Sequence, residues 1–539
     1  MNHHFEFPDY VVFFFYAFII LSVGLWVSRN KKGHSKTSED YFLASKSLTW
    51  WAVGASLIAA NISAEQFIGM SGSGFAIGLG IATYEWIGAL GLIIVGKFFL
   101  PVFIEKKIYT MPQFLQQRYD NRVRTILAVF WVLVFVFVNL TSVLYLGALA
   151  IKTIMGVPLM YGILGLALFA AAYSLYGGLS AVAWTDVIQV VFLIGGGLFT
   201  TWLALDFVSN GHGVISGAEK IYHSAPEKFH MILHKDNPYF KDLPGISMLI
   251  GGIWVANLYY WGFNQYIIQR ALASKSIEEA QKGVIFAGFL KILIPLLVVI
   301  PGITAFVLVN DPVAMAKFSD VSKAYMPTLQ HADKAYPWLM GLLPTGIKGL
   351  AFAALVAAIV SSLASMLNST STIFTMDIYR QFINKNATET RTVNIGRITA
   401  FAALIIAGLI APVLQSLDQV FQYIQEYTGM VSPGILVIFL FGLFWPKTTT
   451  NAAIWVAVLT LPVALIFKFG FSSIPFINQM GLCFLFLSGI IIVISLLDKK
   501  HPAGKGLELS GNIFHTSMSF NIGSVLITTI LAVLYILFW

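Results

Sequence analysis

The chain has 539 residues, of which 58% are hydrophobic and 11% are charged, and its net charge is +8. A soluble domain is nearer a quarter charged, and a soluble protein of this composition would expose large apolar patches. Composition therefore excludes a soluble protein, and membrane orientation explains the basic balance better than nucleic acid does. The one cysteine, Cys483, excludes a disulfide framework and a thiolate metal site.

Apolar runs of about 20 residues recur along the whole chain, each long enough to cross roughly 30 Å of hydrocarbon. The start, MNHHFEFPD, lacks the basic region of a cleavable signal peptide, so we expect the first run to be a retained span. One membrane domain covering residues 1–539 is predicted. Its fourteen expected spans begin near Tyr10, Leu48, Ala82, Thr125, Leu159, Val187, Met248, Val284, Gly349, Thr399, Gln422, Ala452, Met480 and Ile522.

The basic residues favour alternate loops. Most of the 33 Lys and Arg fall in the loops of one side, including Arg122, Arg270 and Arg397. The positive-inside rule makes that side cytoplasmic and places both termini outside. Two longer segments, about 208–246 and 310–345, then lie outside, where we expect them to cover an outer vestibule.

Three of the expected spans have polar interruptions. The second contains NISAEQ at 61–66, the seventh has Asn257 and Asn264 around Tyr260, and the eleventh opens with polar residues before Pro433. Interrupted spans at corresponding places in two halves indicate a transporter with repeated halves and a midplane site. We therefore predict two inverted five-helix repeats and four peripheral helices: a first helix at 9–28, repeats at 48–206 and 247–445, and three helices at 451–539.

A polar stripe runs along the ninth span, where Ser361, Ser365, Asn368 and Thr372 recur at helical spacing. Sodium takes oxygen ligands, which a broken helix and facing hydroxyls can supply. Small polar residues also pack helices together and bond back to their own carbonyls. The stripe by itself leaves an ion site and a packing role open.

Long blocks of the chain carry more information than any short motif: ASLIAANISAEQFIGMSGSG, YEWIGALGLIIVGKFFLP, SLYGGLSAVAWTDVIQVVF, GGIWVANLYYWGFNQYIIQR, AAIVSSLASMLNSTSTIFTMDIYR and FQYIQEYTGMVSPG. These blocks resemble the solute:sodium symporter family and, within it, the bacterial sodium/galactose (sodium/glucose-type) symporters. The resemblance runs nearly end to end. It implies an all-α polytopic membrane protein with fourteen transmembrane helices, broken helices and a leucine-transporter-type 5+5 inverted repeat.

The resemblance also implies a sodium site. Asp186 is placed on the sodium exit path, although an acid at this position could simply cap a helix N-terminus. Ala364 stands where some relatives use a hydroxyl to bind a second sodium, so we expect one sodium per sugar. The implied sodium ligands come from two elements: the backbone carbonyls of Ala59, Ile62 and Ala358 and the hydroxyls of Ser361 and Ser362.

A sugar presents hydroxyls and one apolar ring face, so its site needs amides or charged groups and an aromatic platform. Such groups occur within the expected spans. The predicted sugar-binding residues are Gln66, Glu85, Asn257, Lys291 and Gln425, with Tyr260 as the platform and inner gate. Three further residues match the family's outer gate: Met70, Tyr84 and Phe421.

Glu85 and Lys291 are the most informative of these residues. A charge near the bilayer centre costs roughly 2.5–3.5 kcal/mol on the insertion scale, so both should face the bundle and have partners. An ion pair that only holds helices together is the alternative. Gly88 replaces a serine of the galactose symporters, which removes one hydroxyl contact and puts galactose itself in question.

The predicted function is a secondary active symporter, not an enzyme, that couples inward sodium movement to uptake of a hexose, galactose or glucose, by alternating access. Its partners are the sugar, sodium as the coupling ion and the lipid bilayer, with no cofactor and no nucleic acid. A bacterial inner membrane is the expected location. A sodium symporter for an amino acid or acidic sugar, and a membrane sensor or channel, are the alternatives.

Overall fold

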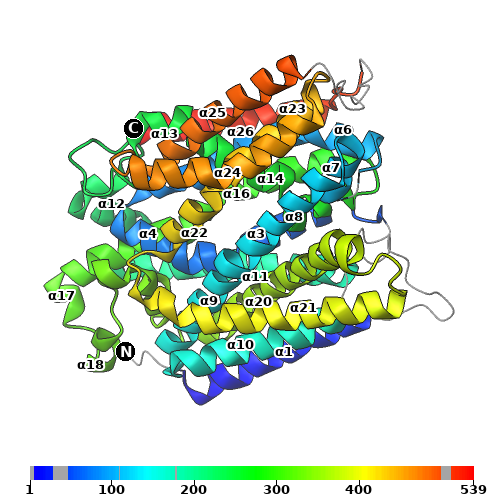
Figure 1. The fold of residues 1–539 in the computed structure, drawn as a ribbon. Coiled ribbons are helices and arrows are strands. Elements are labelled where there is room, and N and C mark those ends of the chain that lie inside the picture. The colour runs from blue at the N-terminus through cyan, green and yellow to red at the C-terminus, as the bar shows by residue number, and fades with distance from the viewer. Residues whose placement is uncertain (1–4, 28–45, 109, 177–178, 499–511) are drawn as a thin grey trace.

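The computed structural model describes residues 5–27, 46–108, 110–176, 179–498 and 512–539, and this part of the chain is almost entirely helical. The only β-structure in these ranges is an isolated bridge between Leu48 and Ser274. The helices form one bundle, with α1 (Phe7–Val27) at one flank and α24 (Thr450–Gly470) and α25 (Phe476–Leu497) at the opposite flank (Figure 1). The all-helical prediction is confirmed.

The second expected span is broken in its middle. Helix α3 (Trp50–Asn61) ends before Ile62, whose backbone is extended (φ −78°, ψ 91°), and the chain resumes as η2 (Glu65–Met70) and α4 (Ser71–Ala76). The Ser63 hydroxyl accepts a hydrogen bond from the Glu65 amide at 3.3 Å, and the Ser63 amide donates to the side-chain oxygen of Gln66 at 3.4 Å. Side chains therefore satisfy backbone groups that the break releases, as a membrane interior requires.

The seventh and eleventh expected spans are interrupted as well. The seventh consists of α13 (Gly245–Ile250), α14 (Gly252–Phe263) and α15 (Gln265–Leu272), and Asn264 between the last two is extended (φ −82°, ψ 117°). The eleventh bends by 46° between α22 (Val420–Gly429) and α23 (Ser432–Phe444). All three polar interruptions in the sequence thus coincide with breaks or bends of helices.

The other elements follow the expected order of spans and loops. They are η3 (Leu79–Ala82), α5 (Thr83–Ile94), η4 (Val95–Phe99), α6 (Leu100–Glu105), α7 (Met111–Arg118), α8 (Asn121–Val134), η5 (Phe135–Leu140), α9 (Thr141–Met155), α10 (Leu159–Tyr176), α11 (Leu179–Val208), α12 (Val214–Ser224), η6 (Pro226–Phe229), α16 (Ile277–Asn310), α17 (Pro312–Met315), α18 (Asp320–Ala324), η7 (Leu329–Lys334), α19 (Ala335–Met340), α20 (Ile347–Ile373), η8 (Phe374–Ile383), α21 (Glu389–Ile410), η9 (Ala411–Ser416) and α26 (Met518–Leu537).

Helix α16 lies at the centre and contacts α3, α4, α5 and α11. Glycines permit the closest of these approaches. A Cβ on Gly74 would come within 2.9 Å of the Val299 carbonyl oxygen, and a Cβ on Gly302 would overlap the carbonyl oxygen of Ser71. Small residues at such contacts are how helices pack closely inside a membrane.

Ten of the described helical segments are long and apolar enough to cross a membrane, and the bent pair α22–α23 makes an eleventh. The three other expected spans correspond to α1, to the broken run α3–η2–α4 and to α10. Their apolar stretches are shorter (7–20 and 159–171) or interrupted. Each predicted span therefore coincides with helix, while the number of fourteen crossings stays a prediction.

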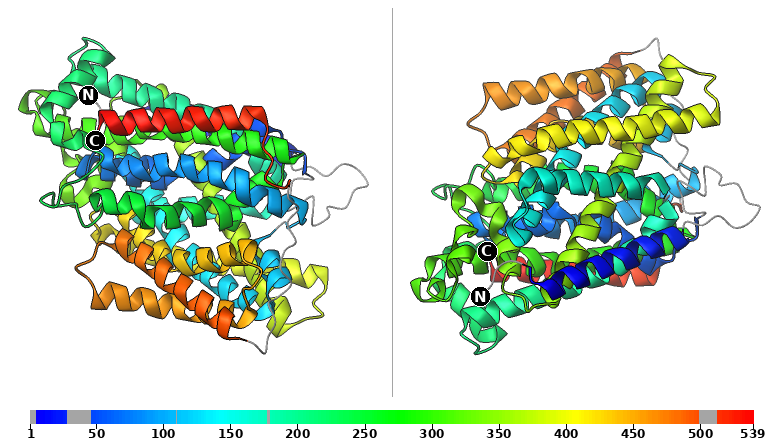
Figure 2. Two further views of the ribbon diagram at one scale, coloured as in Figure 1. Left: turned by 90° about the horizontal axis from the view of Figure 1, so that it is seen from above. Right: turned by 90° about the horizontal axis from the view of Figure 1, so that it is seen from below.

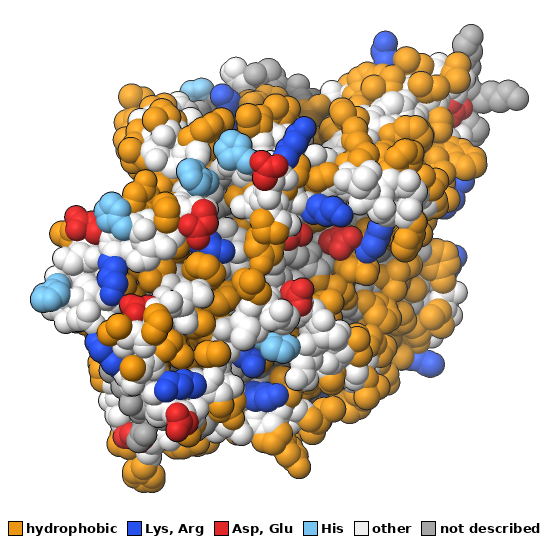
Figure 3. Space-filling view, turned by 90° about the vertical axis from the view of Figure 1, so that its left-hand side faces the viewer, with side chains coloured by type: hydrophobic (Ala, Val, Ile, Leu, Met, Phe, Trp, Pro, Cys, Tyr) orange, Lys and Arg blue, Asp and Glu red, His pale blue; other side chains and the backbone are white. Residues whose placement is uncertain are grey.

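Residues 209–244 and 311–346 lie at one end of the bundle, which we call the loop end, together with both termini (Figure 2). The Lys228 ammonium donates to the Ala76 carbonyl at 2.5 Å, and the Met231 amide donates to the Phe538 carbonyl at 2.7 Å. The Asp9 carboxylate accepts from the Gly346 amide at 2.7 Å. Charged and histidine side chains are scattered over this face (Figure 3). The loop end is therefore hydrogen-bonded to α4, to α1 and to the C-terminal end of α26.

Candidate functional site

One cavity at the centre of the bundle lies beside the helix breaks of the second and seventh spans. It is lined by residues from η2, α5, α14, α16 and α22. The structure brings all of the predicted sugar-binding residues to this cavity: Gln66, Glu85, Asn257, Lys291 and Gln425, together with Tyr260. Amides, a carboxylate, an ammonium and an aromatic ring therefore surround one space, the set of groups that a neutral polyhydroxyl solute requires.

Lys291 and Glu85 form a buried ion pair between α16 and α5, with side chains only 2% and 3% exposed. The Lys291 ammonium also donates to the Asn61 side-chain oxygen at 2.5 Å and lies 4.9 Å from the centre of the Trp261 ring. Each charge thus has the partners that its burial demands. The pair both ties two helices together and supplies polar atoms to the cavity.

Tyr260 lies where the network around Lys291 meets the break in the seventh span. Its hydroxyl accepts from the Asn61 amide at 3.1 Å and shares a hydrogen bond with the Tyr266 hydroxyl at 3.1 Å. Its ring meets that of Trp261 edge to face, with centroids 5.1 Å apart. Tyr260 therefore connects the end of α3 with α14 and α15, the two helices that flank the break at Asn264.

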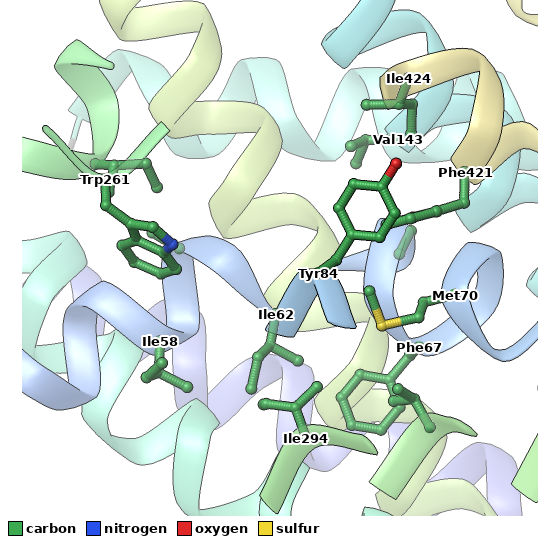
Figure 4. Close-up of a cluster of buried hydrophobic side chains, with 14 of the residues drawn as sticks. Ile58, Ile62, Phe67, Met70, Tyr84, Val143, Trp261, Ile294, Phe421 and Ile424 are labelled. Atoms are coloured by element: carbon green, nitrogen blue, oxygen red, sulfur yellow. The ribbon is translucent and has the colours of Figure 1, made fainter. Parts of the chain in front are cut away.

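The predicted outer-gate residues also lie together, as Figure 4 shows. The rings of Tyr84 and Phe421 meet edge to face at 5.3 Å, and both line the cavity. Met70 is fully buried beside them and does not itself line the cavity. Tyr84 and Phe421 therefore close one wall of the cavity, and Met70 lies beside them outside the lining.

Gly88 lies directly against the cavity residues. A Cβ at this position would be 3.0 Å from the Asn257 side-chain oxygen and 3.2 Å from the Trp261 ring nitrogen. The serine expected from the galactose symporters would therefore place its hydroxyl among these groups. The departure at Gly88 is thus a change directly beside the cavity lining.

Sequence reasoning missed several polar residues that line the same cavity. Glu65, Asn139 and Asn264 lie there, and the Glu65 carboxylate and the Asn264 side chain each have one buried oxygen without a partner among the described groups. Glu65 and Asn264 stand in the interrupted stretches, which was a signal available in the sequence. Asn139 lies in an unremarkable apolar run of η5, and only packing places it here.

The implied sodium ligands lie on α3 and on Ile62, which directly follows it, and on α20, which contacts α3. Because α3 ends at Asn61, the carbonyls of its last turn, including that of Ala59, lack following helical amides to accept from. The Ser362 hydroxyl is buried and has no hydrogen-bond partner among the described residues. Ile62 and Ala358 are likewise buried. This donor set consists of neutral oxygens and fits a sodium ion.

Ser361 is engaged differently, because its hydroxyl donates to the Asp186 carboxylate at 2.9 Å. The second carboxylate oxygen of Asp186 accepts from Ser56 at 2.8 Å and lies 3.5 Å from the Arg270 guanidinium. Asp186 is fully buried in this cluster. Asp186 lies within α11, seven residues after its first residue, Leu179, so the alternative that it only caps a helix N-terminus is wrong.

Arg270 corrects one expectation from the sequence. We expected it in a basic cytoplasmic loop, but it lies on α15 with its side chain 1% exposed. Besides Asp186, it contacts the Tyr266 carbonyl and the Ser365 hydroxyl. These partners offset the cost of burying the Arg270 charge. The distribution of basic residues among loops could not predict them.

Comparison with known proteins decides the family. The sequence profile of the sodium:solute symporter family matches residues 41–459. The chain belongs to the sodium:solute symporter family. A family member from Vibrio parahaemolyticus, named sodium/glucose cotransporter, is 59% identical over 100% of this chain and 99% of its own length. The mouse sodium/myo-inositol cotransporter 2 is 34% identical over 85% of this chain and 69% of its own.

Solved structures agree on the fold of this symporter. The substrate-bound outward-open structure of a Na⁺-coupled sialic acid symporter superposes with a TM-score of 0.77 at 24% identity, covering 92% of this chain and 99% of that one. Mhp1 in its inward-facing conformation matches with a TM-score of 0.50 at 15% identity, over 92% and 99%. The family resemblance and the coarser prediction of an all-helical membrane transporter fold are confirmed, while the fourteen spans and the inverted repeat stay predictions.

Proposed function

We propose that this symporter couples the inward movement of sodium to uptake of a hexose, galactose or glucose. One observation carries the proposal: the side chains of Gln66, Glu85, Asn257, Lys291 and Gln425 surround a single buried cavity. The full-length similarity to a protein named sodium/glucose cotransporter supports it. The substrate contacts are assigned to these five residues, with Tyr260 as the stacking platform.

Sodium is assigned to the gap between α3 and α20, held by the carbonyls of Ala59, Ile62 and Ala358 and the hydroxyls of Ser361 and Ser362. The unpartnered Ser362 hydroxyl supports this assignment. To bind sodium, Ser361 has to turn a lone pair toward the ion while its O–H continues to donate to the Asp186 carboxylate. This contact gives Asp186 a role on the exit path. Ala364 offers no hydroxyl, so one sodium moves per sugar.

The proposed topology follows the broken helices. Fourteen spans form two inverted repeats of five, at 48–206 and 247–445, with four peripheral helices. The loop end and both termini face outward from a bacterial plasma membrane. Sodium bound beside the break of α3 favours the arrangement that holds sugar, and the repeats then rock against each other. Tyr260 yields as the inner gate, while Met70, Tyr84 and Phe421 close the outer side.

A sodium symporter for another small solute, such as an amino acid or an acidic sugar, is the second candidate, because relatives differ in their named solutes. The ion pair argues for a neutral solute. A carboxylate needs a free cation, whereas the Lys291 ammonium already has Glu85 as its partner. The hexose is therefore preferred.

The deciding experiment is uptake of labelled galactose, glucose, myo-inositol and sialic acid into proteoliposomes, with and without an inward sodium gradient. Concentrative hexose uptake that disappears when choline replaces sodium supports the proposal. The Ser362→Ala variant should need more sodium for half-maximal uptake. Concentrative uptake of sialic acid alone would make the second candidate correct.

A further inference from the structure

A second cavity, of about 490 Å³, lies apart from the central cavity, between α1, α9, α10, α11 and α20. Its wall is almost wholly hydrocarbon and aromatic, with Phe13, Phe18 and Phe169 among the lining residues. Several residues at its rim, including Phe14 and Tyr161, are more than half exposed on the flank of the bundle. The cavity is therefore open to molecules dissolved in the lipid.

One polar side chain faces this apolar space. Gln189 lines the cavity from α11 and is 1% exposed. Its side-chain carbonyl oxygen has no hydrogen-bond partner among the described residues. A buried acceptor without a donor is costly, and the cost is greater where no water is at hand. A molecule that enters the cavity and donates one hydrogen bond to Gln189 would remove this cost.

Helix α10 has a glycine in the cavity wall, where a side chain would have room. A Cβ on Gly165 would meet nothing within 4 Å, although Gly165 lines the cavity. One turn earlier, a Cβ on Gly162 would be 3.1 Å from Ala148 of α9. Gly162 thus brings α10 against α9, and Gly165 leaves the void beside it.

We propose that this cavity binds an elongated apolar alcohol taken up from the membrane, with its hydrocarbon along the aromatic wall and its hydroxyl donating to Gln189. The lining residues include no Lys, Arg, Asp or Glu, so they offer nothing to a charged headgroup. Apolar cavities several times smaller, of about 150 Å³, already bind apolar molecules. The acyl chain of an ordinary phospholipid would fill the space but leave Gln189 unsatisfied.

The occupant would contact α20, which carries three of the implied sodium ligands, through residues that are not ligands. Ala357 and Val360 of α20 line this cavity, whereas Ala358 and Ser361 belong to the proposed sodium site. The alcohol site therefore shares a helix with that site and none of its assigned ligands. Its test does not require transport.

The test uses the full-length protein in lipid nanodiscs and a twelve-carbon alcohol carrying a photoreactive diazirine at mid-chain. Crosslinks mapped by mass spectrometry should concentrate on cavity residues such as Phe18 and Phe169. Unlabelled dodecanol should compete better than dodecane by about fivefold, the value of one net hydrogen bond. The Gln189→Leu variant should lose that difference between the two competitors.

Matched substitutions of glycine give the control. Gly165→Phe fills the void and should abolish labelling of the cavity, whereas Gly195→Phe, on the exposed face of α11 where a Cβ also meets nothing within 4 Å, should not. Labelling that follows lipid exposure evenly and ignores Gly165→Phe would overturn the proposal in favour of bulk lipid. Equal competition by dodecane and dodecanol would overturn the role of Gln189.

Discussion

Glu85 and Lys291 show how single residues can serve structure and binding together. Both side chains are almost completely buried, and both line the central cavity. Removing one partner of such a pair leaves an uncompensated charge, which costs roughly 3–5 kcal/mol. Single substitutions therefore cannot separate a structural tie from a contact with sugar.

A double substitution separates the two roles. Lys291→Met should lower the midpoint of thermal unfolding and abolish uptake, because Glu85 is left charged and Asn61 loses its donor. Glu85→Gln combined with Lys291→Met should recover most of the unfolding midpoint but not the uptake, as measured by thermal denaturation in detergent and by proteoliposome assay. Recovery of wild-type uptake in the double variant would reduce the pair to a structural tie.

Asp333 is the second residue whose burial has a measurable consequence. It lies in η7 at the loop end, 3% exposed, and accepts a hydrogen bond from the Val420 amide at 3.0 Å. Burial raises its pKa from 3.8 to about 8. The folded protein therefore keeps a proton on Asp333 that the unfolded chain releases near pH 4.

The stability contributed by neutral Asp333 is full below pH 4 and is lost as the pH rises toward 8, because the folded state binds more protons over that window. Asp333→Asn keeps an acceptor for Val420 and cannot ionise. We expect this variant to flatten the fall in the thermal unfolding midpoint between pH 6 and 8. The exposed Asp320 of the same segment provides the control, since Asp320→Asn should leave the slope unchanged. An unchanged slope in Asp333→Asn would contradict the assignment.

At the scale of elements, the helix breaks free backbone groups for ligands, whereas the glycine contacts hold helices together. The breaks at Ile62 and Asn264 release backbone groups toward the centre of the bundle, where side chains and a bound ion can reach them. The glycines hold α4, the last helix of the second span, against α16. One half of that span is thus fixed to its neighbour while its middle is left open for ligands.

Gly302 tests this contact between elements. Gly302→Leu would force a side chain into the backbone of α4 at Ser71, and overpacking of this kind costs about 1–3 kcal/mol. We expect a lower thermal midpoint and less monodisperse protein in size-exclusion chromatography. Gly195→Leu, which meets open space, should behave like the wild type. Equal stability of the two variants would show that α4 is not held by this contact.

The whole molecule sets the energetics of transport. One sodium charge moving through about 100 mV supplies roughly 2.3 kcal/mol. A tenfold sodium gradient adds about 1.4 kcal/mol. If one sodium accompanies each sugar, the steady-state accumulation of sugar is limited to several hundred-fold.

This limit can be measured in proteoliposomes at a clamped potential. We expect one positive charge to enter per hexose, from the ratio of sodium flux to sugar flux, and a reversal potential that matches that ratio. Two charges per sugar, or accumulation of about ten-thousandfold under these gradients, would require a second sodium. The missing hydroxyl at Ala364 would then not determine the number of sodium ions per sugar.

The sequence alone could predict the helices and their breaks, because these depend on the chemistry of neighbouring residues. A span must be apolar and must satisfy its own backbone, so hydropathy located the helices, and polar runs located their breaks. The long blocks that resemble the family also indicated which of these polar residues belong to the substrate site. These features depend on residues close together in the chain.

Only the tertiary structure decided which distant side chains meet. Asp186 lies beside Arg270 and Ser361, although these two residues follow it by 84 and 175 positions in the chain. Asn139 lines the central cavity, and Gln189 lines the second cavity, through packing alone. Hydropathy ranks each residue by its own polarity, whereas burial of a polar group is decided by the partner it finds, and that partner is set by how the helices pack.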